Sequence, residues 1–363
     1  MKERINVDGV LSAIGKTPLV RLTRLPGDNS PTVYAKLEGI NPGGSIKDRA
    51  ALAIIQDAIS KGLVRPKGLV IESSSGNMAI ALAQVCLYFD LRLICVVDPR
   101  ATQQNLKIIG AYGAEVEMVS TPDPSTGEYL VARIKRVHEL LGKFPGAFWP
   151  DQYSNRANSD AHHYTMAEMA EALGYKVDYL FCSASTCGTL RGCAEYIQSQ
   201  GMTTQIYAID AIGSVIFDGQ ASEGSKKGMK RLIPGHGAGV RPALFQPWLA
   251  ARCILVSDLD CVIGCRRLLK REGIMAGGSS GGVVMAFELV KHELVSDSVC
   301  VLVMPDRGER YLDTIYSDSW VRENFGDPAE ILQENQRVHE SPVTIRHDTA
   351  VRLRALSSVR DGG

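Results

Sequence analysis

The sequence predicts an α/β fold in which parallel-rich sheets carry helices on both faces. Apolar runs of strand length alternate with amphipathic runs of helix length along most of the 363 residues, and strands separated by helices usually pair in parallel. Apolar residues make up 45% and charged residues 22% of the chain, as in globular proteins with a sizeable core. A stretch rich in proline and glycine at 143–150 interrupts this alternation and indicates two lobes with a crevice between them.

Short apolar runs rich in β-branched residues are the expected strands. They are Val33–Lys36, Leu69–Ile71, Arg92–Val97, Val116–Val119, Tyr179–Cys182, Gln205–Ile209, Cys253–Val256 and Val299–Met304. Between them, apolar residues recur at helical spacing. The expected helices include Ala50–Ala58, Met78–Leu87, Thr102–Tyr112, Leu130–Leu141, Leu190–Gln198 and Val283–Leu294. Ligands of such folds bind beyond the carboxyl ends of the strands, so functional residues are expected in the loops there.

The chain divides into three parts. We expect a smaller α/β lobe at 41–148 and a larger α/β lobe formed by 1–40 together with 149–326. The alternation of strands and helices stops near Asp327, and 327–363 is polar, with five basic and six acidic residues and a net charge of −1. We interpret this tail as an appendage that is partly helical at most.

The charge balance argues against two classes of partner. Forty Lys and Arg residues offset forty Asp and Glu residues, so the chain has no net field to attract nucleic acid or an anionic membrane. The longest apolar run, 78–89, is too short for a bilayer, which needs ~20 residues. The first residues lack the apolar core of a signal peptide, and we expect a cytoplasmic protein.

The cysteines and histidines follow no metal-binding pattern. None of the nine cysteines forms a Cys-x-x-Cys pair, and the seven histidines show no His-x-x-x-His spacing. We therefore expect no metal site, and we expect most cysteines to be small buried apolar side chains.

Four loops contain residue types suited to chemistry. In the first, Asn41-Pro-Gly-Gly-Ser-Ile-Lys47-Asp-Arg49, Ser45 and Asp48 have capping-box spacing, so a helix should start here with Lys47 in its first turn. The helix dipole disfavours a cation at that position, and a desolvated amine loses its proton more easily, as a Schiff-base nucleophile must. The alternative is an ordinary solvated lysine beside a helix cap.

Two further loops join a strand to a helix. Glu72-Ser-Ser-Ser-Gly-Asn77 offers hydroxyls, an amide and backbone N–H groups that suit a carboxylate, and Ser183-Ala-Ser-Thr-Cys-Gly-Thr189 offers hydroxyls and N–H groups that suit a phosphate. No Gly-x-Gly-x-x-Gly motif or Walker lysine is present, so a dinucleotide or triphosphate is not expected. Either loop could also be a plain capped turn.

The fourth loop, Ala276-Gly-Gly-Ser-Ser-Gly-Gly282, precedes the helical run that begins at Val283. Its glycines allow the backbone to approach a ligand closely, and a hydroxyl there could face a ring nitrogen. The alternative is a flexible tight turn. Together, the four loops supply an amine that can form an imine, cradles for a carboxylate and a phosphate, and a hydroxyl.

The order of these motifs resembles the cysteine synthase/cystathionine β-synthase family of fold-type II pyridoxal-phosphate enzymes. The resemblance runs from about Leu11 to Trp320. The matching stretches are Ile14-Gly-Lys-Thr-Pro18, Lys36-Leu-Glu38, Asn41-Pro-Gly-Gly-Ser-Ile-Lys-Asp-Arg49, Ser75-Gly-Asn77, Gln152-Tyr-Ser-Asn-Arg-Ala-Asn158, Gly235-His-Gly-Ala-Gly239, Glu272-Gly-Ile274 and Gly308-Glu-Arg-Tyr-Leu312. The resemblance implies the two-lobed fold of tryptophan synthase β-subunits, pyridoxal 5'-phosphate as the cofactor, and a homodimer.

The resemblance also implies roles for site residues. Lys47 would join the cofactor through its amine and act as the general base, Asn77 would bond the 3′-oxygen of the ring, and Ser279 would meet the pyridine nitrogen. A hydroxyl there leaves the nitrogen largely unprotonated, which suits β-elimination. The cofactor phosphate would be held by Ser185, Thr186, Cys187, Gly188 and Thr189, and the substrate carboxylate by Ser74, Ser75 and Gln152.

Several stretches depart from cysteine synthases. Ser185-Thr-Cys-Gly-Thr189 replaces Gly-Thr-Gly-Gly-Thr, Met78 replaces a threonine, and Met304 to Trp320 differs from the usual Pro-Ser-x-Gly-Glu-Arg-Tyr. With Val97-Asp-Pro-Arg100 and Asp210-Ala-Ile-Gly-Ser-Val-Ile216, these features look like the N-(2-amino-2-carboxyethyl)-L-glutamate synthases. That subgroup combines O-phospho-L-serine with L-glutamate on the way to 2,3-diaminopropionate for siderophores or peptide antibiotics.

A dicarboxylic second substrate would need a cation and hydroxyls, because burying its charges unpaired is costly. Our candidates are Arg133, on the helical pattern 129–141, and the hydroxyls of Tyr153 and Ser185. Arg133 could instead be a solvated arginine on a helix face. Two other functions stay open: a cysteine synthase that uses O-acetylserine or O-phosphoserine with sulfide, and a catalytically silent scaffold that binds a partner through its tail.

Overall fold

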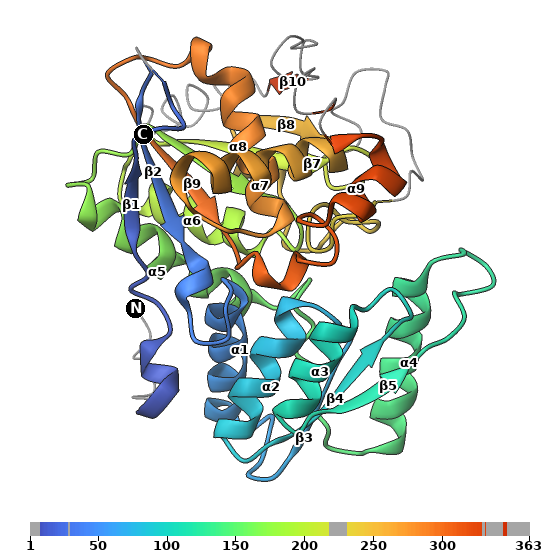
Figure 1. Cartoon of the computed structure of the whole chain (residues 1–363). Coiled ribbons are helices and arrows are strands. Elements are labelled where there is room, and N and C mark those ends of the chain that lie inside the picture. Colours follow the sequence, from blue (N-terminus) through green and yellow to red (C-terminus); the bar gives the residue numbers. More distant parts are fainter. Residues whose placement is uncertain (1–7, 28–29, 218–230, 329–330, 332–343, 347–363) are drawn as a thin grey trace, which may run out of the picture.

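The computed structural model describes residues 8–27, 30–217, 231–328, 331 and 344–346. Within these residues the chain forms two α/β bodies, each built on its own sheet (Figure 1). The larger sheet has seven strands in the order β1-β2-β9-β6-β7-β8-β10, and the smaller has three in the order β3-β4-β5. The larger body therefore contains chain segments from before and after the smaller one.

The large sheet is parallel at its centre and antiparallel at both edges. Its strands are β1 Leu19–Leu22, β2 Thr32–Leu37, β6 Tyr179–Ser183, β7 Gln205–Ala211, β8 Arg252–Val256, β9 Val299–Met304 and β10 Thr344–Arg346. Strands β2, β9, β6, β7 and β8 pair in parallel, whereas β1 and β10 pair with β2 and β8 in the antiparallel sense.

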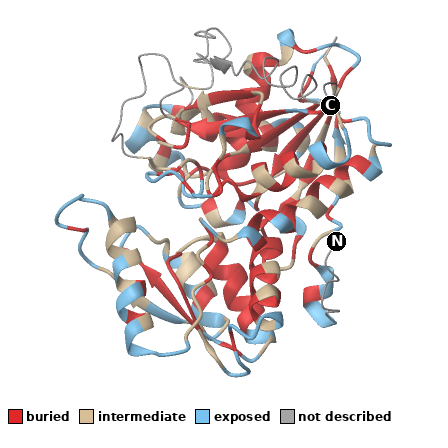
Figure 2. Cartoon of the chain, turned by 180° about the vertical axis from the view of Figure 1, so that it is seen from behind, coloured by how far each residue is buried: buried red, intermediate tan, exposed pale blue. Residues whose placement is uncertain are grey.

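Helices cover both faces of this sheet. The helices of the larger body are α5 Arg156–Ala172, α6 Gly188–Ser199, α7 Asp258–Glu272, α8 Gly278–Val290 and α9 Asp318–Phe325. Because side chains alternate along a strand, Phe181 of β6 packs in the core with α7 and α8, while Leu180 and Cys182 pack in the core with α5 and α6. Figure 2 shows the strands of this sheet buried between the two helix layers.

The smaller body repeats this arrangement on a parallel sheet. Its strands are β3 Leu69–Glu72, β4 Arg92–Val97 and β5 Glu115–Met118, and its helices are α1 Lys47–Ser60, α2 Asn77–Tyr88, α3 Gln103–Ala111 and α4 Tyr129–Lys143. Val70 and Leu93 face the core formed with α1 and α2, and Ile71 and Ile94 face the core formed with α4. Phe148 extends the sheet by exchanging backbone hydrogen bonds with β3.

The prediction of parallel-rich sheets with helices on both faces is confirmed. Strands β1 and β10 and helices α5, α7 and α9 were not predicted from the sequence. Helix α5 escapes an apolar periodicity because its buried face contains small and polar side chains, among them Asn158, Ser159 and His162. The expected strand at 116–119 lies one residue earlier, at 115–118.

One expectation about a loop was wrong. The glycine-rich segment before Val283 is not a separate turn, because α8 begins at Gly278 and the segment forms its first turns. The tail contributes the edge strand β10, Thr344–Arg346, which was not predicted. Its remaining residues lie outside the described ones apart from 327–328 and 331. Residues 1–7, which bear on a signal peptide, also lie outside them. No helix among the described residues is long and apolar enough to cross a membrane.

Gly192 sets the closest approach between α5 and α6. A Cβ atom on this residue would overlap the backbone oxygen of Ser159 and crowd His162. Both neighbours belong to α5 and are fully buried, so they cannot move aside cheaply. Helices α5 and α6 can therefore pack this closely only because Gly192 has no side chain.

We expect Gly192→Ala to lower the free energy of unfolding by ~1–3 kcal/mol, because the added methyl overpacks a rigid helix contact. Gly110→Ala is the matched control, since a Cβ on Gly110 in α3 meets no atom within 4 Å. It should be neutral or stabilise by up to ~1 kcal/mol. Urea unfolding of both variants would measure the difference, and equal stabilities would contradict the assigned contact.

Candidate active site

A cavity of about 480 Å³ lies between the two bodies. Its wall contains the loops that follow β3, β4, β6 and β9 and the first turns of α1, α2, α6 and α8. The carboxyl ends of the strands of both sheets therefore meet here, which is where open parallel sheets bind ligands.

Every site residue expected from the sequence lines this cavity. These residues are Lys47, Ser74, Ser75, Asn77, Arg133, Gln152, Tyr153, Ser185, Thr186, Cys187, Gly188, Thr189 and Ser279. They come from both bodies and from distant parts of the chain, so the fold assembles one composite site from them.

Lys47 is the first residue of α1, as expected. Its amine Nζ lies 3.4 Å from the hydroxyl oxygen of Thr186, which belongs to the loop after β6. Desolvation by burial lowers the pKa of Lys47 to about 8, against weaker opposing effects of the Cys182 and Cys187 thiols. A substantial fraction of this amine is therefore neutral and nucleophilic near neutral pH.

The capping box expected at Ser45 and Asp48 is not formed. The Ser45 hydroxyl accepts a hydrogen bond from the backbone N–H of Lys47 (3.2 Å), and the Asp48 carboxylate accepts one from Gly43 (2.5 Å). Gly44 has a φ of +86°, and the turn that it makes places the backbone of Gly43 next to the Asp48 side chain. A Cβ on Gly43 would collide with that carboxylate, so the glycines serve the turn that leads into Lys47.

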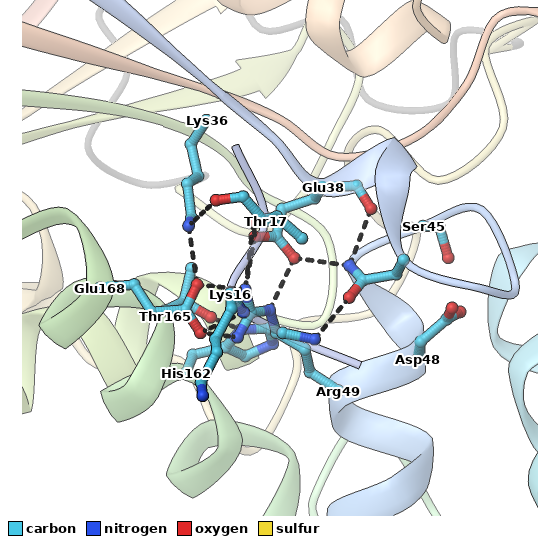
Figure 3. A network of polar contacts seen from close by, with 12 residues as sticks. Lys16, Thr17, Lys36, Glu38, Ser45, Asp48, Arg49, His162, Thr165 and Glu168 are labelled. Atoms are coloured by element: carbon cyan, nitrogen blue, oxygen red, sulfur yellow. Dashed lines mark hydrogen bonds and ion pairs between the residues drawn. The ribbon is translucent and has the colours of Figure 1, made fainter. Parts of the chain in front are cut away.

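A buried ion-pair network fixes α1 (Figure 3). The guanidinium of Arg49 donates to Glu38 (Nε–Oε2, 2.7 Å) and to Glu168 (Nη1–Oε1, 2.7 Å). Lys36 donates to the other oxygen of Glu168 (2.7 Å). Although burial opposes it, the hydrogen bonds from Arg49 and Lys36 lower the pKa of Glu168 to about 2. The network joins α1 to strand β2 and helix α5.

The loop 185–189 has the geometry of an anion cradle. Cys187 has a φ of 62°, in the left-handed region, and it directs the next backbone N–H groups into the first turn of α6. A Cβ on Gly188 would overlap the amide of Asn158, whose buried oxygen has no hydrogen-bond partner. Free N–H groups at a helix N-terminus bind phosphate well, so this loop fits the phosphate of pyridoxal 5'-phosphate.

Asn77 and Ser279 face this cradle from two other helix starts. The side-chain amide of Asn77 donates to Asp306 (2.7 Å), and its oxygen accepts from Arg310. Ser279 is buried in the first turn of α8. Both residues line the same cavity as Lys47 and the loop 185–189.

Arg133 is a helix residue whose side chain is 13% exposed and has a carboxylate partner, so it is not a solvated arginine. Its Nε lies 3.2 Å from Asp98 Oδ2, but the N–H has no hydrogen-bond partner because it is not aligned with that oxygen. Asp98 is held more firmly by Arg100, with two contacts of 3.0 Å. Burial lowers the pKa of Arg133 while Asp98 opposes this. One carboxylate thus serves two guanidinium groups.

The cavity residues without a role assigned from the sequence include Asp98, Arg231, His236 and Asp306. Asp98 and Asp306 stand in stretches that depart from cysteine synthases, and His236 stands in a stretch that matches them. These departures were the available signal. Arg231 stands in no motif.

Outside the cavity wall, Asp160, His163 and Glu195 have potential metal-ligand atoms within 4.8 Å of one another. Arg156 and Arg191 already donate to the Glu195 carboxylate, so its charge is balanced within the protein. All nine cysteines are buried and unpaired, which confirms the expectation of small apolar side chains.

A lysine of lowered pKa that faces a phosphate cradle between two α/β bodies defines a pyridoxal-phosphate enzyme of fold type II. The chain belongs to the family of pyridoxal-phosphate dependent enzymes, whose family model matches residues 10–306.

Relatives within this family make the comparison finer. The chain is 45% identical over 313 residues to an N-(2-amino-2-carboxyethyl)-L-glutamate synthase of Ralstonia nicotianae, a match that covers 86% of this chain and 90% of that one. Among solved structures it resembles the O-acetylserine-dependent cystathionine β-synthase of Helicobacter pylori (28% identity, TM-score 0.77, 86% of this chain and 100% of that one). It also resembles O-acetylserine sulfhydrylase isoform 3 of Entamoeba histolytica (27% identity, TM-score 0.78, 92% and 97%).

The lowered pKa of Lys47 predicts how uptake of the cofactor depends on pH. Only the neutral amine attacks a carbonyl, and the neutral form becomes dominant as pH rises through about 8. Attachment of pyridoxal phosphate to the cofactor-free enzyme should therefore accelerate between pH 7 and 9 and then level off. Stopped-flow absorbance would measure it, and a rate that keeps rising to pH 10 would refute the lowered pKa. Lys47→Ala and Lys47→Arg should not attach the cofactor, since guanidinium stays charged.

Proposed function

We propose that this enzyme converts O-phospho-L-serine and L-glutamate to N-(2-amino-2-carboxyethyl)-L-glutamate and phosphate. The observation that carries the proposal is the 45% identity, over nearly the whole body of the chain, to the synthase of Ralstonia nicotianae. In this reaction the Cβ–O bond of phosphoserine breaks, phosphate leaves with the electron pair, and the glutamate nitrogen bonds to Cβ and gives up a proton.

Named residues of the cavity would hold the cofactor. Lys47 would attach it, Asn77 would bond its 3′-oxygen and Ser279 would meet its pyridine nitrogen. The phosphate would lie on Ser185, Thr186, Cys187, Gly188 and Thr189. When bound, the cofactor withdraws electrons from Cα of the substrate and makes its proton acidic. Ser74, Ser75 and Gln152 would hold the substrate carboxylate on the hydroxyls and backbone N–H groups that follow β3.

Lys47 would also move the proton. Its amine lies in the cavity beside the Thr186 hydroxyl and, when not attached to the cofactor, would be available to take up a proton. With a pKa of about 8 it can accept the Cα proton near neutral pH and return it later. Burial in the low-dielectric wall lowers the pKa of Lys47 and so makes its amine a usable base.

The surroundings of Tyr153 favour a long, dicarboxylic acceptor over sulfide. A smaller cavity of about 100 Å³ adjoins the main one and shares Ser73, Leu130, Tyr153 and Val240 with it. In the main cavity, Arg133 would hold a glutamate carboxylate together with the hydroxyls of Tyr153 and Ser185. Sulfide needs neither the room nor the cation. A cysteine synthase is the second candidate, favoured by the 27% identical solved structure of an O-acetylserine sulfhydrylase.

Several wider features belong to this proposal. The product would serve as a precursor of 2,3-diaminopropionate for siderophores or peptide antibiotics. The enzyme would act in the cytoplasm as a homodimer. The segment 41–148 would form the smaller lobe, and 1–40 with 149–326 the larger, cofactor-binding lobe. The silent-scaffold alternative finds no support in a chain with an intact Lys47 and cradle.

Product analysis tests the proposal directly. We expect the holoenzyme with O-phospho-L-serine and L-glutamate to release phosphate and form N-(2-amino-2-carboxyethyl)-L-glutamate, identified by mass spectrometry. Sulfide in place of glutamate should react more slowly, because it has no carboxylate for Arg133 to bind. Faster turnover with sulfide than with glutamate would favour a cysteine synthase, and no turnover with either would revive the scaffold.

Arg133→Ala separates the two half-reactions. Phosphate release from O-phospho-L-serine alone should largely survive. Reaction with glutamate should fall by about ten-fold or more, or ~1.4 kcal/mol, because the carboxylate loses its bidentate partner. Rapid-quench measurement of each half-reaction would show this. Equal loss in both, or in neither, would reject Arg133 as the glutamate ligand.

A further inference from the structure

Arg231 is a cavity residue without a role in the proposed function. It lines the same cavity as Lys47 and Tyr153. Its Nη1 atom is buried and has no hydrogen-bond partner. Arg133 has a carboxylate 3.2 Å away, whereas no ion pair joins Arg231 to another residue in the part of the chain that the structure describes. An N–H group that is shielded from water without an acceptor costs free energy unless a ligand supplies that acceptor.

Two glycines leave room for the guanidinium of Arg231. A Cβ on Gly237 would lie 3.0 Å from its Nη1, and a Cβ on Gly239 would lie 3.4 Å from its Nη2. Gly237 has a φ of +68° and donates its N–H to the backbone oxygen of Ala184 (2.8 Å). The loop 235–239 therefore leaves a recess for Arg231. The hydrogen bond of Gly237 ties this loop to Ala184, the residue before the loop 185–189.

His236 of the same loop is a second buried group with unused hydrogen-bonding capacity. It is 2% exposed, it lines the cavity, and neither ring nitrogen has a hydrogen-bond partner. Burial, with a smaller effect of Arg231, lowers the pKa of His236 to about 4. The imidazole is thus neutral at working pH and adds no charge to this part of the wall.

We propose that Arg231 determines substrate specificity by binding an oxyanion of a substrate in this cavity, as a second guanidinium subsite in addition to Arg133. The inference rests on the proposed function, in which the two substrates bring a phosphate and a side-chain carboxylate. Both anions match the planar fork of arginine. Two guanidinium groups, one already partnered by Asp98, would let the cavity hold one anionic group from each substrate.

The test measures anion binding rather than turnover. Isothermal titration calorimetry of the full-length holoenzyme would use inorganic phosphate in one series and glutarate in the other. The attached cofactor occupies the 185–189 cradle, so phosphate cannot bind there. The variants are Arg231→Met, which removes the charge, and Arg231→Lys, which keeps it without the fork. Arg92→Met is the control, since that guanidinium pairs with Glu115 (2.8 Å) and lines neither cavity.

We expect Arg231→Met to weaken binding of one or both anions by about ten-fold or more, with a smaller loss in Arg231→Lys and none in Arg92→Met. Loss for phosphate assigns the subsite to the first substrate, and loss for glutarate assigns it to the acceptor. Unchanged binding in Arg231→Met, equal loss in Arg92→Met, or no binding of either anion to the wild-type enzyme would overturn the inference. If binding depends on Arg231 but no product forms from phosphoserine and glutamate, the proposed function fails while the subsite stands.

Discussion

The buried pairing of Arg49 with Glu38 and Glu168 is the interaction on which the arrangement of the site depends. Arg49 belongs to α1 of the smaller body, Glu38 follows β2 of the large sheet, and Glu168 lies on α5. Buried charges of this kind are expensive unless every partner is present, and loss of one typically costs ~3–5 kcal/mol. Because Lys47 precedes Arg49 by two residues, the same network sets where the reactive amine enters the cavity.

Periodicity predicted most of the fold because most elements bury apolar stripes. Strand β9 was located residue for residue, since Val299–Met304 is apolar on both faces, as central parallel strands are. Helix α5 was not, because it packs through polar side chains and the close approach at Gly192 rather than through an apolar stripe. Strand β10 is three residues long in a polar tail, and pairing with the edge of β8 defines it. Such tertiary contacts have no local sequence pattern.

The site likewise contains residues that a local motif predicts and residues that meet only through tertiary contacts. Lys47, Asn77 and the loop 185–189 were predictable because each stands at the start of a helix that follows a recognisable motif. Their partners were not. Asp98 meets Arg133, and Asp306 meets Asn77, only when segments distant in sequence are folded together. A single chain indicates that residues such as Val97-Asp-Pro-Arg100 are unusual, but the charge they compensate becomes visible only in three dimensions.

The left-handed backbone of Cys187 has a thermodynamic consequence for the cradle. A cysteine in that conformation is strained by ~1–2 kcal/mol relative to glycine, yet glycine would lose more chain entropy on folding, ~0.4–1 kcal/mol. The entropy term offsets about half of the strain, so glycine would be favoured by only ~1 kcal/mol. Burial raises the pKa of the thiol, which keeps it uncharged, so the cysteine adds a side chain to the loop without adding a negative charge.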